Sequence, residues 1–125
     1  MINKNLGFTL SELMVSAAIL SFVFAALLLF FINSIFLNEA NRKLTIATTH
    51  AQYALEEMKN TNFSSLASTT WYASTISGKG LTPLPNESIM ITVTGTEPKD
   101  IVATVRWAYR GTYPSIALET LITEP

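Results

Sequence analysis

The sequence contains no cysteine, a single histidine and few charged residues, which make up 14% of its 125 residues. The absence of cysteine excludes disulfide bonds, thiolate metal sites, cysteine nucleophiles and lipid-modified cysteines. The formal net charge is −1 and no basic run occurs, so we expect no direct binding of nucleic acid. His50 has no evident acid–base partner in the sequence. We therefore expect it to be solvated or to have a packing role rather than a catalytic one.

Two further absences define the first half of the chain. Proline and glycine are absent from residues 8–60, and charged residues are absent from residues 13–37. The uncharged run of 25 residues would span roughly 38 Å as a helix, enough to cross a hydrocarbon core about 30 Å thick. We predict one long helix of about fifty residues. Its first half, residues 8–37, lies in a membrane, and its second half, residues 38–60, is amphipathic. Apolar residues spaced three and four apart form one stripe along it, comprising Leu37, Ala40, Leu44, Ala47, Ala51, Ala54 and Met58.

Residues 61–125 are expected to form a small globular head. Serine, threonine, glycine and proline dominate residues 61–86, which predicts a loop held against the helix by Phe63, Leu66, Trp71 and Tyr72. Beyond it the apolar pattern changes to a period of two, which predicts antiparallel strands at about residues 87–95, 100–109 and 115–122. The helix stripe and the sheet face can cover each other. The expected fold class is therefore α+β, with one long amino-terminal helix packed on a small antiparallel sheet of about three strands.

The polar and aromatic residues of the head do not form a recognisable reactive site. We expect Trp71 and Trp107 in or beside the core rather than in a sugar-binding platform. Glu97, Lys99 and Asp100 share a turn, but two acids beside a lysine fall short of a calcium cage, and we predict no metal site. No nucleophile–base pair can be assembled from the sequence. We therefore predict no enzymatic activity and no cofactor.

A short basic leader precedes the apolar helix. Lys4 and the terminal amino group place positive charge before the apolar run, which predicts a cytoplasmic amino terminus. Gly7-Phe8-Thr9-Leu10-Ser11-Glu12 follows, and Glu12 is the one charged residue between positions 5 and 37. A carboxylate at membrane depth is costly, so Glu12 needs a partner or a place at the interface where it can snorkel. We expect Thr9 and Ser11 to make local hydrogen bonds at the helix start. The apolar run exceeds the usual core of a secretory signal peptide, whereas a plain signal anchor fits it.

This amino-terminal segment resembles the processing site of type IV prepilins and of type II secretion pseudopilins. The resemblance covers about the first 60 residues by motif and the remainder by architecture. It implies that prepilin peptidase removes residues 1–7 by cutting between Gly7 and Phe8, and then N-methylates Phe8. It also implies that Glu12 pairs in a filament with the Phe8 amino group of a neighbouring subunit. Such a pair would cancel both charges and set the axial register of the helices.

Three features favour a minor pilin or pseudopilin over a bulk fibre subunit: an unbroken membrane helix, a short head and no carboxy-terminal cysteine pair. The stretches "ALEEMKN" and "VRWAYRGTYPSIALETLI" resemble the V or I type of these subunits. That type implies a place near the filament tip, where the subunit starts assembly of a type IV pilus, a competence pilus or a type II secretion pseudopilus.

The resemblance also implies partners and a location. The partners are other pilin or pseudopilin subunits, prepilin peptidase, an inner-membrane assembly platform and membrane lipid. The chain would cross the inner membrane once with an extracytoplasmic head, before it enters a periplasmic or cell-surface filament. The alternative is a signal-anchored extracytoplasmic binding module that does not polymerise. That module would keep its leader and tolerate Glu12→Ala.

Overall fold

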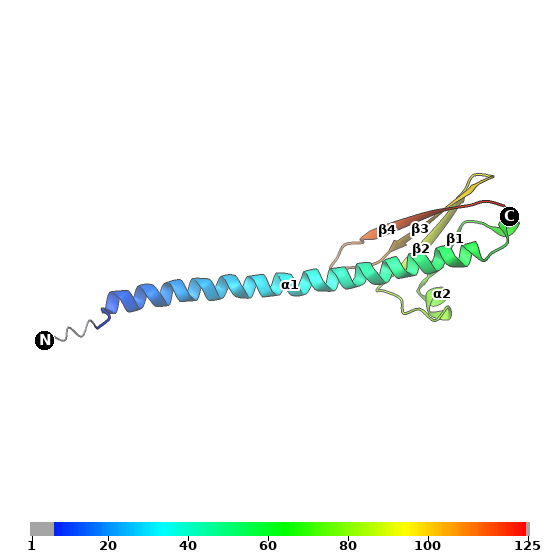
Figure 1. The fold of residues 1–125 in the computed structure, drawn as a ribbon. Coiled ribbons are helices and arrows are strands. Elements are labelled where there is room, and N and C mark those ends of the chain that lie inside the picture. Colours follow the sequence, from blue (N-terminus) through cyan, green and yellow to red (C-terminus); the bar gives the residue numbers. More distant parts are fainter. Residues whose placement is uncertain (1–6, 125) are drawn as a thin grey trace. The chain divides into compact units, whose positions relative to one another are not determined.

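The computed structural model describes residues 7–124, which divide into two compact units between Glu39 and Ala40. Lys4, whose charge we assigned to the leader, lies outside the described residues. Helix α1 runs without a break from Leu10 to Lys59, over 50 residues (Figure 1). The prediction of one long helix is confirmed. Its continuity follows from the absence of the two residues that most often interrupt helices, proline and glycine.

The first unit exposes its apolar side chains. Every described residue up to Glu39 is exposed, including large side chains such as Phe22 and Leu28. Ser21 and Ser34 interrupt the apolar run, but each hydroxyl donates to the carbonyl oxygen four residues earlier, at 2.8 and 2.9 Å. The hydroxyl groups of these two serines are thus satisfied within the helix. By length and composition, α1 is able to cross a membrane.

In the second unit, α1 packs on the head through small side chains. Ala47, Ala51 and Ala54 are fully buried, and Met58 is buried one turn further on. The three alanines belong to the same core cluster as the buried residues of the sheet, as the predicted stripe requires. The buried part of the predicted stripe begins at Ala47, because the side chain of Leu44 is 45% exposed.

The head contains one antiparallel sheet with the strand order β1-β2-β3-β4 (Figure 1). Residues that face the helix pair across neighbouring strands, so that Ile91 lies opposite Ala103 and Ile89 opposite Val105, and all four are buried. Alternate residues of a strand point to opposite faces, which explains the apolar period of two. The strands are β1 (Thr69–Tyr72), β2 (Ser88–Thr94), β3 (Lys99–Arg106) and β4 (Ser115–Ile122); a short 3₁₀ helix η1 spans Phe63–Ser65, and α2 spans Ala73–Gly78.

The expected count of about three strands is wrong, because the segment we predicted as a loop, residues 61–86, contains β1, η1 and α2. Strand β1 is four residues long, too short to show a clear alternation of apolar and polar residues. It forms because Trp71 pairs with Ile89 and is buried in the core. Trp107 is also buried, which confirms the packing role expected for both tryptophans. Tyr72, expected to hold this segment against the helix, is exposed instead.

Candidate functional site

The start of α1 is closed by a reciprocal pair of hydrogen bonds between Thr9 and Glu12. The Thr9 backbone N–H and hydroxyl both donate to Oε2 of Glu12, at 2.9 and 3.0 Å, and the Glu12 N–H donates to the Thr9 hydroxyl at 3.3 Å. This arrangement is a capping box, in which a Thr and a Glu three residues later satisfy donors that the first helical turn leaves free. Thr9 therefore acts as the local helix-start residue that we expected, and its hydroxyl also lies 3.1 Å from that of Ser11.

The capping box gives Glu12 a local role that our sequence reasoning missed. The spacing Thr9-x-x-Glu12 was the available signal. The box uses one carboxylate oxygen, because Oε1 makes no hydrogen bond within residues 7–124. A carboxylate offers about four lone-pair sites, so Oε1 can accept a further donor while Oε2 closes the helix.

The two residues before Thr9 have few contacts within the described chain. A Cβ built on Gly7 would meet no atom within 4 Å, and Gly7 does not have a positive φ. The fold of residues 7–124 therefore sets no steric requirement for glycine at this position. Phe8 is 85% exposed, so its ring is not held in the core of this chain.

A second cluster lies in the head, where His50 on α1 meets Glu87. Nδ1 of His50 lies 2.7 Å from Oε1 of Glu87, and Oε2 accepts the Leu84 backbone N–H at 2.6 Å. Both residues are buried. His50 thus has the packing role that was one of our two expectations, and it also has a carboxylate partner that the sequence did not make evident. The partner is 37 residues away in the sequence, and no local pattern could have indicated it.

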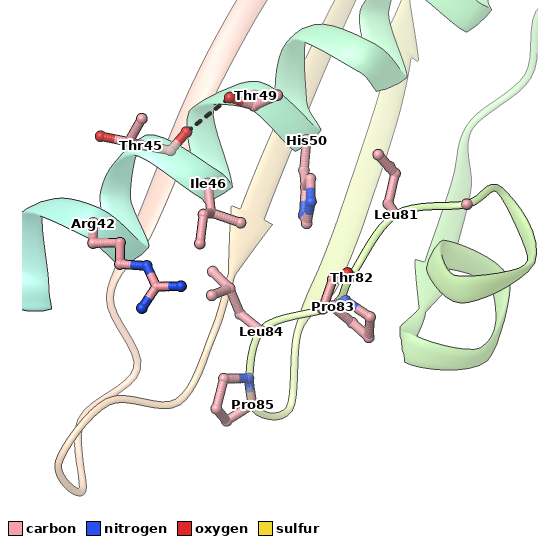
Figure 2. A pocket seen from close by; sticks show the side chains of 11 residues that line it. Arg42, Thr45, Ile46, Thr49, His50, Leu81, Thr82, Pro83, Leu84 and Pro85 are labelled. Carbon is pink, nitrogen blue, oxygen red and sulfur yellow. Dashed lines mark hydrogen bonds between the residues drawn. The ribbon is translucent and has the colours of Figure 1, made fainter.

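His50 also borders a groove between α1 and the segment that precedes β2. Figure 2 shows Arg42, Ile46 and His50 extending from α1 toward the segment that carries Leu84. The groove has a volume of about 490 Å³. Its walls are mainly apolar, and the segment Gly80–Pro85 forms the side opposite α1.

The remaining candidate residues do not converge on a reactive centre. Lys99 Nζ donates to the carbonyl oxygen of Phe63 at 2.6 Å and lies over the Phe63 ring. It therefore anchors the start of β3 near the end of α1 instead of facing a ligand. In residues 7–124, no group of three or more His, Asp or Glu side chains is placed to hold a metal ion.

Comparison with known proteins concerns the amino-terminal segment. Residues 2–28 match the family model described as the prokaryotic N-terminal methylation motif. No curated protein and no solved structure matched the chain. The motif indicates a structural protein that associates with pilin subunits and is processed by prepilin peptidase, and together with the apolar helix it is consistent with membrane anchoring. The chain thus carries a type IV pilin-like prepilin motif on an α+β, pilin-like fold.

Proposed function

We propose that the chain is a structural subunit of a type IV pilus-like or type II secretion-like filament. Prepilin peptidase cuts it between Gly7 and Phe8 and methylates the new amino group of Phe8. The mature chain then leaves the inner membrane, through an assembly platform, and packs its apolar helix against those of its neighbours.

The observation that carries this proposal is the uniformly exposed apolar half of α1, whose first part lies within the matched methylation motif. Within its own chain this surface is uncovered, since all described residues up to Glu39 are exposed. Apolar area of this size is stable only in lipid or against other protein. Lipid surrounds this half of α1 while the subunit is in the membrane. Neighbouring subunits cover it once the subunit enters the filament.

Glu12 fits a role between subunits as well as its role within the helix. Oε2 closes the first turn of α1, and Oε1 is free to accept the Phe8 ammonium of a neighbouring subunit. Pairing the two charges removes the penalty of burying either alone among apolar helices. The pair would also set the axial register, because apolar contacts by themselves allow helices to slide.

The finer proposal is a minor pilin or pseudopilin of the V or I type that starts assembly near the filament tip. The short head and the unbroken helix support this reading. Genes next to this one would indicate whether the filament serves secretion, DNA uptake, adhesion or motility.

The intact mass of the protein from its native membrane tests the proposal. In cells with prepilin peptidase we expect loss of residues 1–7 and one added methyl group on Phe8, and in cells without it we expect the full chain. Gly7→Val is the matched variant. It should block cleavage while the head keeps its native tryptophan fluorescence, because the fold sets no steric requirement at this position.

One outcome would overturn the proposal. If the protein keeps Met1 in peptidase-containing cells and Glu12→Ala changes nothing, the chain is a signal-anchored binding module.

A further inference from the structure

The groove beside His50 contains polar groups that the processing motif does not explain. Arg42 makes no hydrogen bond or ion pair within residues 7–124. Arg42 and His50 lie eight residues apart on α1, which separates them by about 12 Å along the helix. Between them the groove is lined by apolar side chains such as Ile46, Leu81 and Leu84. An unpaired cation beside an apolar groove is complementary to an acidic segment with few other charges.

His50 adds a second unused group. Because Oε1 of Glu87 is a carboxylate oxygen at 2.7 Å, we assign a proton to Nδ1 of His50. The other ring nitrogen, Nε2, has no hydrogen-bond partner among the described residues. The groove therefore presents a positive charge at Arg42 and a ring nitrogen of His50 without a hydrogen-bond partner.

The turn between β2 and β3 has the complementary chemistry. Residues 95–98 are exposed, and Glu97 forms no hydrogen bond or ion pair within residues 7–124. Gly95 keeps the turn tight, since its φ is +81° and a Cβ there would lie 2.8 Å from the Pro98 carbonyl oxygen. Thr96 places a hydroxyl donor next to the Glu97 carboxylate.

The turn and the groove lie at opposite ends of the head. Lys99, directly after the turn, donates to the Phe63 carbonyl oxygen, which places the turn near the end of α1 at Lys59 (Figure 1). Arg42 precedes Lys59 by 17 residues, roughly 26 Å along the helix. Glu97 therefore cannot reach Arg42 of its own chain.

We propose that the Glu97 turn of one copy docks in the groove of the next copy. Glu97 pairs with Arg42, and the Thr96 hydroxyl forms a hydrogen bond with Nε2 of His50. Because the two surfaces differ, the contact is head-to-tail and can repeat along a filament. The neighbour must be displaced along α1 by roughly 26 Å. This inference rests on the proposed function in its general form, a filament in which several copies of the chain follow one another, and it does not apply to a single copy at the filament tip.

Disulfide cross-linking tests the contact with little background, because the native chain has no cysteine. Thr49 lines the groove and Thr96 is on the turn. The full-length T49C/T96C double variant, oxidised in its native membrane, should form a ladder of dimers, trimers and larger species on a non-reducing gel. T49C and T96C alone should remain monomeric, because a head-to-tail contact does not bring two identical positions together.

Reversal of the charges at positions 42 and 97 provides a second test of the contact. In the T49C/T96C background, R42E and E97K should each reduce the ladder about fivefold, and the R42E/E97K combination should restore it. E119K changes the same charge on β4, away from the contact, and should have no effect. Tryptophan fluorescence of each variant verifies that the head is folded.

Leader removal and pelletable filaments, measured in the same cells, separate this inference from the proposed function. Processed protein in filaments without a ladder, or a ladder insensitive to both reversals, overturns the docking contact alone. Unprocessed protein without filaments overturns the proposed function.

Discussion

Nδ1 of His50 and Oε1 of Glu87 lie 2.7 Å apart inside the head and join α1 to the segment that enters β2. The other carboxylate oxygen accepts the Leu84 N–H at 2.6 Å. Glu87 thus accepts one hydrogen bond from α1, at His50, and one from the segment before β2, at Leu84. This single side chain holds one wall of the groove against the helix.

Glu87→Ala should lower the free energy of unfolding of the head by about 3 kcal/mol, because it leaves buried donors on His50 and Leu84 without an acceptor. Glu87→Gln should lower it by only about 1 kcal/mol, since the amide oxygen still accepts one bond. Urea unfolding of the full chain in detergent, followed by the fluorescence of Trp71 and Trp107, measures both values. Glu119→Ala is the control on the exposed face of β4. Equal losses for Glu87→Ala and Glu119→Ala would contradict the role of the pair.

Gly95→Ala should destabilise the head by about 2 kcal/mol, because its positive φ and the nearby Pro98 carbonyl oxygen leave no room for a Cβ. Gly78→Ala is the matched control. A Cβ at Gly78 meets no atom within 4 Å and its φ is not positive, so its effect should stay within about 0.5 kcal/mol. Thermal unfolding of the two variants side by side checks this difference. Similar melting temperatures would show that the turn tolerates a side chain.

Ala51→Leu should destabilise the head by about 2 kcal/mol, because Ala51 is fully buried where α1 meets the sheet. Gln52→Leu adds a similar side chain at the next position, which is exposed, and should be close to neutral. The urea midpoints of the two variants provide the comparison. If Ala51→Leu is as stable as the wild type, the core around Ala51 has room for a larger side chain.

Thr9→Ala and Glu12→Gln should separate the two roles of Glu12. Thr9→Ala removes the hydroxyl bonds of the capping box but keeps the carboxylate, so we expect slight fraying of the first helical turn and normal filament yield. Glu12→Gln keeps an acceptor for the cap but loses the charge, so filament yield should fall at least about tenfold while leader cleavage continues. Sedimentation of sheared filaments, with intact mass as the processing control, measures both. A normal filament yield for Glu12→Gln would limit Glu12 to helix capping.

The sequence by itself determined the elements that depend on near neighbours along the chain. Helix α1 follows from an uninterrupted run of residues without proline or glycine, and its buried face follows from alanines spaced three and four apart. Strands β2, β3 and β4 follow from the period of two. The capping box was equally local, since Thr9 and Glu12 are three residues apart, although our sequence reasoning gave Glu12 no capping role.

Only the tertiary structure decided which distant segments meet. Strand β1 forms because Trp71 pairs with Ile89 and is buried in the core. Its four residues are too few for the sequence pattern alone to predict a strand. The His50–Glu87 pair and the groove beside it depend on the path of the chain after α2. Local sequence specifies backbone preference and the face that each element buries. The partner of a single polar side chain is set by the packing of whole elements, because many placements satisfy the same apolar pattern.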